Sequence, residues 1–440
     1  MESPFPKTTK QKRFSFSVSG RQADKEEEGE EDEGSFLRDA NMLSQKLASP
    51  QRMFGKGLSF RQSITRDSIL SSGEIDVEYS VNRVSHVGGG HFRKDPATLQ
   101  LKGGLPDTIA RDVSFASFSR VKHICDGSNS NLFKCTWENR EVIVKRLKIV
   151  RISVPHVLSE FEFESEFLRR STDCPHLVLI LAYGFDLINE HDLPGDVPFD
   201  PNNQLAVTSA SGDRHVQVPF VVLEPLTGGS LGFFLSKQRS YHSRPFTVSR
   251  ALTIMRQAAE AVCYIHEGFD ANYCVIHRDL KPDNFVFDDR NVLRLIDFGL
   301  SICVRKTVSA KESFAMTGGT GSLRYMAPEV ASSLPYNDRS DIYSWAIIAY
   351  EVLTGVAPYG NINKQKFVTR VIEKRERPPL DIDEYGRRIR APQAAKDLIE
   401  RCWNHDYTLR PSASEVLAAC RQLEADQLAI EAKRRGCGCS

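Results

Sequence analysis

The chain has 440 residues, with 58 Lys and Arg against 57 Asp and Glu, and 40% of the residues are hydrophobic. This length admits roughly one large domain or two to three small ones, and the near-neutral charge gives no support to a nucleic-acid partner. The absence of zinc-type cysteine spacing, of an apolar signal segment and of an apolar run of ~18 residues predicts a cytoplasmic protein.

Residues 1 to about 115 are rich in Ser, Gly and charged residues and have little periodic apolar patterning. Such a segment cannot bury enough apolar surface to offset the entropy lost on ordering, so we expect a disordered regulatory tail.

From about residue 118 the pattern changes to short β-rich runs and one amphipathic stretch. A helix is expected over Pro155–Arg170, with Leu158, Phe161 and Leu168 on its apolar face. The polar stretch from about 187 to 218, which contains Pro, Gly and Asn, is expected to be an inserted surface loop. Strands are expected over 119–125, 132–137, 141–147, 177–185 and 219–224.

After Gly229 the pattern is mostly helical, with helices expected over 251–266, 341–353 and 412–423. The sequence therefore predicts an α+β fold of two lobes. A small β-rich lobe would cover about 116–224, and a larger helical lobe about 228–424. A basic, cysteine-containing tail would follow over 425–440.

Three short motifs carry the chemistry of the chain. The first is His277-Arg278-Asp279-Leu280-Lys281-Pro282-Asp283-Asn284, the second Asp297-Phe298-Gly299 and the third Ala327-Pro328-Glu329. In this order and with these separations they resemble the catalytic loop, the metal-binding motif and the APE motif of eukaryotic protein kinases. The resemblance covers about residues 118–423 and implies ATP and Mg²⁺ as ligands and proteins as substrates.

The resemblance implies a role for each of these polar residues. Asp279 would orient the incoming hydroxyl, and Lys281 would place a cation near the γ-phosphate. Asn284 and Asp297 would supply oxygen ligands to Mg²⁺, which prefers such hard donors. If the three motifs were coincidental, the same carboxylates would be ordinary turn residues.

Val142-Ile143-Val144-Lys145 resembles the strand that carries the ATP-binding lysine, so Lys145 is expected to contact the α- and β-phosphates. Its partner on the following helix is expected to be Glu164, which lies closest to the apolar face, with Glu162 as the alternative. The remaining glutamates of this helix are expected to form a solvated face.

The loop that would cover the phosphates departs from the family pattern. Residues 124–132 keep only the middle glycine, Gly127, and Cys125 and Ser130 replace the other two. Glycine allows a backbone N–H to approach a phosphate closely, so this departure leaves nucleotide affinity open. The adenine slot would be formed by Ile124, Leu132 and Val286, with Leu223 as gatekeeper and Glu224 to Leu226 as hinge. Leu226 would supply the hinge donor because Pro225 has no N–H.

Other motif residues would support or regulate the site. Glu329 and Arg410 resemble a buried ion pair of the helical lobe, and Asp341 resembles the carboxylate that holds the catalytic-loop backbone. Lys281 and Ser322 resemble serine/threonine rather than tyrosine kinases. The Cys402-Trp403 and Arg410-Pro411 segment resembles the tyrosine-kinase-like group of these enzymes.

The segment between Asp297 and Glu329 contains four candidate phosphorylation sites, Ser309, Ser313, Thr317 and Thr320. Arg278 would pair with a phosphate there and order the segment, although serine and threonine are common in any flexible loop.

Cys437 is fourth from the end, and Cys439 and a basic run accompany it, which suggests a lipid anchor and membrane association. The alternative is a frayed tail with free thiols.

The sequence thus predicts a serine/threonine protein kinase of intracellular signalling. Two readings remain beside it. One is a pseudokinase or signalling scaffold with weak nucleotide binding, which the degenerate Gly127 loop favours. The other is an adaptor that acts through its N-terminal tail.

Overall fold

The computed structural model describes residues 110–436 and three short strands that precede them. Within 110–436 the gaps are 196, 198, 201–202, 204, 210–211, 241–245, 361, 382–388 and 390. All described residues belong to one of the two compact units of the chain, Phe54–Ser440. The tail predicted over residues 1 to about 115 lies mostly outside the described residues, but its described segments 76–79, 82–85, 97–100 and 110–114 are strands rather than disordered chain.

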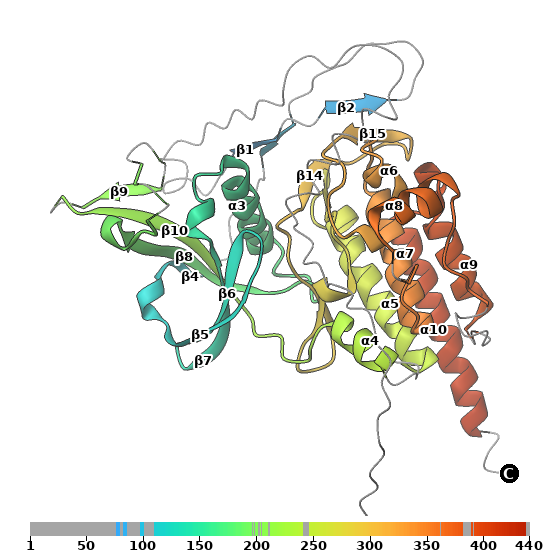
Figure 1. The fold of residues 1–440 in the computed structure, drawn as a ribbon. Coiled ribbons are helices and arrows are strands. Elements are labelled where there is room, and N and C mark those ends of the chain that lie inside the picture. The colour runs from blue at the N-terminus through green and yellow to red at the C-terminus, as the bar shows by residue number, and fades with distance from the viewer. Residues whose placement is uncertain are drawn as a thin grey trace, which may run out of the picture. The chain divides into compact units, whose positions relative to one another are not determined.

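The first lobe is built on a seven-stranded sheet (Figure 1). The strands run in the order β4-β8-β10-β7-β6-β5, and β9 pairs with β10. β4 is parallel to β8, and the other pairs are antiparallel. The strands are β4 (Ala110–Ser114), β5 (Ser119–Asp126), β6 (Ser130–Trp137), β7 (Arg140–Leu147), β8 (Ile180–Asn189), β9 (Ala206–Thr208) and β10 (Arg214–Leu223).

One helix, α3 (Pro155–Arg170), accompanies this sheet and has the predicted bounds. Pro155 stands in the first turn, where its missing N–H removes no helical hydrogen bond. Leu158, Phe161 and Leu168 are all buried, as the apolar periodicity predicts. Their burial fixes which side of α3 turns toward the rest of the protein.

The inserted surface loop predicted between about 187 and 218 is wrong in part. β8 continues to Asn189 and β10 begins at Arg214, so the two strands form a long hairpin with a register from His215↔Asn189 onward. β9 adds a third short strand to it. The strand expected over 177–185 begins instead at Ile180. Polar strand residues are tolerated here because this end of the hairpin buries fewer of its side chains.

The second lobe is helical (Figure 1). Its central helix is α7 (Arg339–Thr354), which is buried along its length and ends at Gly355 with a φ of 74°. That left-handed conformation favours glycine and terminates the helix. The other helices are α4 (Leu231–Ser240), α5 (Val248–Cys263), α6 (Pro328–Ala331), α8 (Lys364–Phe367), α9 (Gln393–Cys402) and α10 (Ala413–Gly436).

The last helix is longer than predicted. α10 continues to Gly436, so most of the expected tail over 425–440 is helical. The residues after Leu423 are chiefly Ala, Glu, Gln, Leu, Lys and Arg, which favour helices, and no Gly or Pro interrupts them before Gly436. No described helix is long and apolar enough to span a membrane. Cys437 and Cys439 lie outside the described residues.

Four two-stranded ladders complete the described part of the chain. Two of them flank the motif residues and so position them: β11 (Tyr273–Ile276) with β14 (Ile302–Arg305), and β12 (Phe285–Phe287) with β13 (Leu293–Leu295). The other two involve residues before 110: β1 (Asp76–Tyr79) with β3 (Ala97–Gln100), and β2 (Asn82–Ser85) with β15 (Glu312–Ala315).

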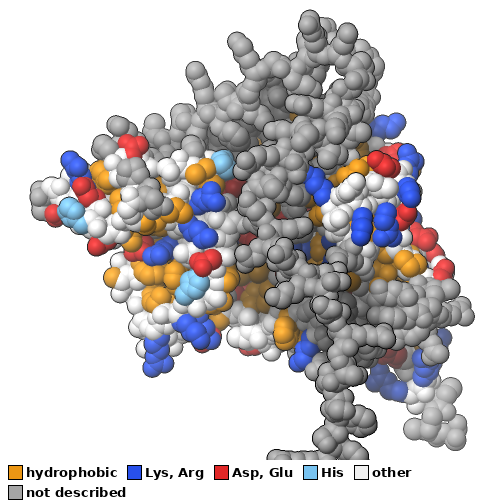
Figure 2. All heavy atoms as spheres, in the orientation of Figure 1, with side chains coloured by type: hydrophobic (Ala, Val, Ile, Leu, Met, Phe, Trp, Pro, Cys, Tyr) orange, Lys and Arg blue, Asp and Glu red, His pale blue; other side chains and the backbone are white. Residues whose placement is uncertain are grey.

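On the face shown in Figure 2, basic and acidic side chains of the described residues are interspersed over both lobes. The expectation that the protein has no nucleic-acid partner stays a prediction.

Candidate active site

A cavity of about 540 Å³ lies between the sheet and the helical lobe. Residues from β5, β6, β7, α3, the end of β10 and the first two motif segments line it, so distant parts of the sequence meet there. Every residue predicted to bind nucleotide or to act in catalysis lines this cavity: Ile124, Gly127, Leu132, Lys145, Glu164, Glu224, Leu226, Asp279, Lys281, Asn284, Val286 and Asp297.

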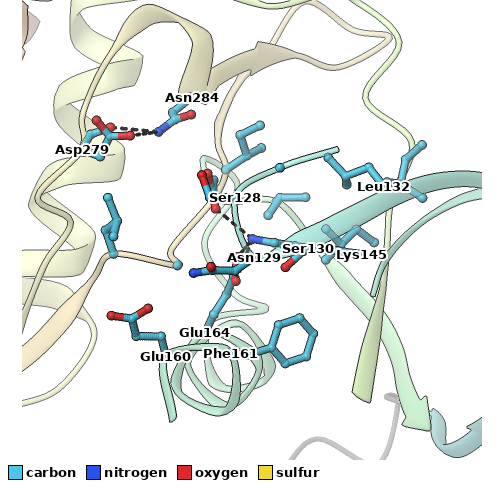
Figure 3. A pocket seen from close by; sticks show the side chains of 18 of the residues that line it. Ser128, Asn129, Ser130, Leu132, Lys145, Glu160, Phe161, Glu164, Asp279 and Asn284 are labelled. Carbon is cyan, nitrogen blue, oxygen red and sulfur yellow. Dashed lines mark hydrogen bonds and ion pairs between the residues drawn. The ribbon is translucent and has the colours of Figure 1, made fainter. Parts of the chain in front are cut away.

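Lys145 of β7 and Glu164 of α3 form a close ion pair. The Lys145 Nζ atom donates to both carboxylate oxygens of Glu164, at 2.7 and 2.8 Å. Glu164 also accepts a hydrogen bond from the Phe298 N–H at 3.1 Å. One carboxylate therefore connects the sheet, the helix and the Asp297-Phe298-Gly299 motif. Of the two glutamates considered from the sequence, Glu164 is the one in this position (Figure 3).

Burial and charge act in opposite directions on this pair. Burial by itself would lower the pKa of Lys145, but the carboxylates of Asp297 and Glu164 raise it above the ordinary value. Burial raises the pKa of Glu164, and the Lys145 ammonium opposes that rise. Lys145 is thus held as a cation inside the cavity.

Asp297 faces the same cation, with 2.8 Å between its Oδ1 atom and Lys145 Nζ. The Lys145 charge holds the pKa of this carboxyl well below its usual range. The next residue, Phe298, is fully buried and packs against Phe167 and His277, with ring centroids 4.7 and 5.0 Å apart. This packing fixes where the Asp297 carboxylate points.

Both oxygens of Asp279 are held by hydrogen bonds. Oδ1 accepts from the Ser322 backbone N–H at 2.7 Å, and Oδ2 accepts from Lys281 Nζ at 2.8 Å. The Asn284 amide nitrogen donates to the Asp279 carbonyl at 2.9 Å and to Oδ2 at 3.4 Å, and Figure 3 shows the two side chains together. These contacts orient the carboxylate before any substrate arrives.

Asp341 on α7 holds the backbone that precedes Asp279 through hydrogen bonds. The two Asp341 oxygens accept the N–H groups of His277 and Arg278 at 2.8 and 3.0 Å, and the His266 ring at 2.9 Å. Burial would raise the pKa of Asp341, but these hydrogen bonds and the nearby histidines lower it. Arg278 has a φ of 67°, a costly conformation that these contacts sustain.

Residues 118–420 match the family model described as the protein kinase domain. This chain belongs to the protein kinase family. The predicted two-lobed kinase fold is therefore confirmed, and so is the resemblance to serine/threonine kinases of the tyrosine-kinase-like group. The finer domain boundaries, including the limit between the lobes, stay predictions.

Three relatives illustrate the similarity. Serine/threonine-protein kinase STY17 of Arabidopsis thaliana is 28% identical over 337 residues, which are 76% of this chain and 50% of that protein. Serine/threonine/tyrosine-protein kinase HT1 of the same plant is 30% identical over 204 residues, 46% of this chain and 47% of that protein. Mitogen-activated protein kinase kinase kinase 7 of Drosophila melanogaster is 32% identical over 212 residues, 48% of this chain and 28% of that protein. The chain thus spans half or less of the length of these relatives.

Two glutamates of the kinase helix α3 were assigned wrongly to a solvated face. Glu160 lines the cavity, and burial raises the pKa of its carboxyl (Figure 3). Glu166 is only 5% exposed and pairs with Arg169 at 3.0 Å and with Arg170. The pattern of apolar residues did not indicate that these two glutamates are buried. For Glu166, the two arginines three and four residues later could have indicated ion pairs.

The activation segment comprises residues 297–329, and its four candidate phosphorylation sites differ in exposure and in hydrogen bonds. Thr317 is exposed, and its hydroxyl accepts a hydrogen bond from Arg278 Nη1 at 2.9 Å. Thr320 Oγ1 donates to the Thr317 carbonyl at 3.2 Å, and Ser309 is exposed. Ser313 is only 2% exposed, so this conformation does not present it to another enzyme.

Ser322 lies beside Asp279 and contacts it through its backbone N–H, which donates to Asp279 Oδ1. The turn that brings this N–H inward passes Gly321, whose φ is 93° and where an added Cβ would lie 2.2 Å from the Arg278 carbonyl. Only glycine fits so close to the catalytic loop.

Glu329 and Arg410 form the predicted buried ion pair. The guanidinium donates to the two carboxylate oxygens at 2.6 and 2.8 Å, and the two residues are 6% and 2% exposed. Arg410 also donates to the backbone carbonyls of Arg339 and Asn404. The pair thereby anchors the end of the activation segment to the start of α7 and to the loop after α9.

Proposed function

We propose that this protein is a serine/threonine protein kinase that transfers the γ-phosphate of ATP to hydroxyl groups of other proteins. The observation that supports this most is the convergence of Lys145, Glu164, Asp279, Asn284 and Asp297 on one cavity. The relatives include a serine/threonine-protein kinase and a serine/threonine/tyrosine-protein kinase, which supports protein hydroxyl groups as the acceptors.

Asp279 would receive the substrate hydroxyl. Its carboxylate is already oriented by Ser322 and Lys281, so an incoming serine or threonine finds an acceptor in a fixed place. Lys281 would neutralise charge that develops on the transferred group. Phosphoryl transfer needs mainly positioning and charge stabilisation, which this arrangement supplies.

The nucleotide would lie with its phosphates on Lys145 and its base in the apolar end of the cavity. Ile124, Leu132 and Val286 line that end, and Leu226 lies where the hinge donor is expected. The Glu224 side chain accepts the Leu179 N–H at 2.9 Å, and its own N–H donates to the Leu179 carbonyl at 3.0 Å. The Glu224 N–H is therefore engaged within the protein, and Pro225 has no N–H. The Leu226 N–H is the proposed donor to the base.

Asn284 and Asp297 fit the Mg²⁺ that the family requires. The Asn284 nitrogen is directed toward Asp279, which leaves its amide oxygen as an acceptor on the other side. The Asp297 carboxyl is held ionised by Lys145, and both residues line the cavity. When bound, the ion would be held by these two side chains together with the nucleotide, whose charge it would neutralise.

Regulation by phosphorylation of the activation segment is proposed for Thr317. Arg278 already contacts the Thr317 hydroxyl, so a phosphate there would meet a guanidinium without rearrangement. The partial loss of glycines around Gly127 favours the pseudokinase alternative, but the complete set of phosphate, metal and hydroxyl contacts opposes it.

A cytoplasmic location in signal transduction is part of the proposal. So is membrane association through lipidation of Cys437 or Cys439, which the exposed basic residues Lys433, Arg434 and Arg435 before them would assist.

Turnover of Mg-ATP by the purified full chain tests the proposal. With a generic basic protein as acceptor, we expect phosphate transfer that falls by about 10²- to 10⁴-fold in Asp279→Asn. Asp289→Asn, a change at an exposed loop position, is the matched control and should keep full activity. No transfer by the wild-type chain, or equal transfer by Asp279→Asn, would favour the scaffold reading.

A further inference from the structure

A strand that precedes the kinase domain pairs with the activation segment. β2 (Asn82–Ser85) lies antiparallel to β15 (Glu312–Ala315) in a four-residue register that runs from Ser85↔Glu312 to Asn82↔Ala315. Figure 1 shows the two strands side by side above the helical lobe. The two strands are more than two hundred residues apart in the sequence, so the pairing is a tertiary contact.

The inner edge of β15 is bonded to the helical lobe. The Phe314 N–H donates to the Tyr336 carbonyl at 2.8 Å, and the Tyr336 N–H donates back at 3.1 Å. The Asn337 amide donates to the Glu312 carbonyl at 2.7 Å on the same side. Backbone groups alternate along a strand, so those of Ser313 and Ala315 point to the outer edge, where β2 lies.

This alternation assigns the ladder bonds between β2 and β15. Ser313↔Val84 and Ala315↔Asn82 are the hydrogen-bonded pairs. Arg83 and Ser85 lie opposite Phe314 and Glu312, whose backbone groups point to the inner edge of β15. Val84 therefore uses its N–H in the ladder, whereas Arg83 does not.

β15 is packed on the elements that carry the catalytic residues. Phe314 is buried with Cys274 and Ile276 of β11 and with Val304 of β14. β11 leads directly into His277 and Asp279, and β14 follows the Asp297 motif. β15 therefore packs on the strand that precedes Asp279 and on the strand that follows the Asp297 motif.

The site beneath this packing is assembled in the same structure. The Lys145–Glu164 pair is closed, and the Thr317 hydroxyl two residues after β15 touches Arg278. The β2-paired conformation is therefore one in which the phosphate-binding and hydroxyl-binding groups are in place.

We propose that residues 82–85 act as an intramolecular strand that holds the activation segment in its assembled conformation, by adding to the outer edge of β15. The occupant of that edge is this chain's own N-terminal segment, joined through backbone hydrogen bonds. Removal of the strand would free one edge of β15, and the activation segment would open more often. The consequence for turnover rests on the proposed kinase function, whereas the pairing itself does not.

A matched pair of proline variants in the full chain tests the ladder. Val84→Pro removes the N–H that pairs with Ser313, and Arg83→Pro removes one that the ladder does not use. Hydrogen exchange of the peptide covering 312–315 should become about fivefold faster in Val84→Pro, the effect of one lost backbone hydrogen bond, and stay unchanged in Arg83→Pro. Unchanged exchange in Val84→Pro, or equal acceleration in both variants, would overturn the proposal.

A disulfide test checks the register without relying on loss of structure. Ser85 and Glu312 form a non-hydrogen-bonded pair, the closer kind in an antiparallel ladder, so Ser85→Cys with Glu312→Cys should oxidise to a disulfide. Ser85→Cys with Ala315→Cys is three residues out of register, beyond reach of a disulfide, and should not. Peptide mass mapping identifies the bond among the native cysteines. Equal or absent crosslinking in both pairs would refute the pairing.

Phosphate transfer by the same variants separates this proposal from the proposed function. If the wild-type chain transfers phosphate, Val84→Pro should be slower than Arg83→Pro, and equal rates would refute the activating role of the strand. If the wild-type chain transfers none, the proposed function fails, while hydrogen exchange and crosslinking still decide whether β2 holds β15.

Discussion

The replacement Glu164→Gln tests how much of the activity depends on the Lys145 ion pair. Glutamine keeps the size of the side chain and an oxygen that can accept the Phe298 N–H, which Glu164 accepts at 3.1 Å. It removes the negative charge and one of the two acceptors that Lys145 uses at 2.7 and 2.8 Å. The substitution therefore weakens the ion pair with Lys145 and leaves the Phe298 hydrogen bond in place.

The magnitude follows from the burial of the pair. The side chains of Lys145 and Glu164 are 12% and 3% exposed, so solvent screens their interaction little. A hydrogen bond to a charged group contributes about 1.5–3 kcal/mol, which corresponds to roughly 10- to 150-fold in rate. Lys145 keeps its contact with Asp297 at 2.8 Å, so we expect the lower part of that range.

Steady-state phosphorylation with varied ATP gives kcat and the KM for ATP of the variant. Glu162→Gln, on the same helix but outside the set that lines the cavity, is the control and should stay within about twofold of wild type. A thermal melt of each variant confirms that both are folded. A loss below about twofold in Glu164→Gln, or a larger loss in Glu162→Gln, would contradict the role given to this ion pair.

Three further predictions concern stability and regulation. Arg410→Met should lower the unfolding free energy in urea by about 3–5 kcal/mol, since it leaves the Glu329 carboxylate buried and unpaired, and a second change of Glu329 to Gln should restore part of the loss. Burial and neighbouring arginines lower the pKa of His405, so the unfolded chain binds the proton more readily than the folded chain, and the unfolding free energy should decrease as the pH is lowered below about 6.5. His405→Gln should weaken this pH dependence in urea titrations at different pH, and an unchanged dependence would contradict the prediction. Thr317→Ala should lower phosphate transfer and remove a phosphopeptide seen by mass spectrometry, whereas Ser309→Ala should change neither.

The residues of the site were predictable where a motif supplied their neighbours. Asp279, Lys281 and Asn284 stand within six consecutive residues, so their mutual contacts follow from a short loop. Lys145 and Glu164 were predictable because a strand and an amphipathic helix follow each other directly, and the helix turns one face to the strand.

The wrong assignment of Glu160 and Glu166 has a physical cause. An apolar stripe identifies one buried side of a helix, and its opposite side is assumed to face water. α3 instead has polar neighbours as well, Arg278 near Glu160 and two arginines of its own around Glu166. Charges are accommodated on its buried sides through pairing, which a hydrophobicity pattern does not report.

The extent of α10 and of the β8–β10 hairpin was missed for a related reason. Both continue beyond the part that packs on a core, so burial no longer marks their residues. For α10 the helix-forming composition after Leu423 was the available signal. For the hairpin it was the alternation of His215, Val216, Gln217 and Val218, which is typical of a strand with one buried face.

The loop around Gly127 uses its backbone groups within its own hairpin. The one retained glycine, Gly127, donates its N–H to the Ser130 carbonyl at 2.8 Å, so that group serves the hairpin rather than a ligand. The residue after β7 also contacts this turn, since the Lys148 N–H donates to the Asn129 carbonyl at 2.8 Å. A Cβ at Gly127 would lie 3.1 Å from Ser130 O, which leaves little room for other residues.

Because the Gly127 N–H is used within the hairpin, the phosphates of the proposed nucleotide would be held mainly by side chains that line the cavity beside this loop. Lys145 provides the cation, and Glu164 and Asp297 fix its position from two sides. A kinase of this design should therefore be more sensitive to Glu164→Gln than to Gly127→Ala, whose only cost is crowding at the hairpin. The reverse order of effects on the KM for ATP would show that the loop backbone, and not the lysine, holds the nucleotide.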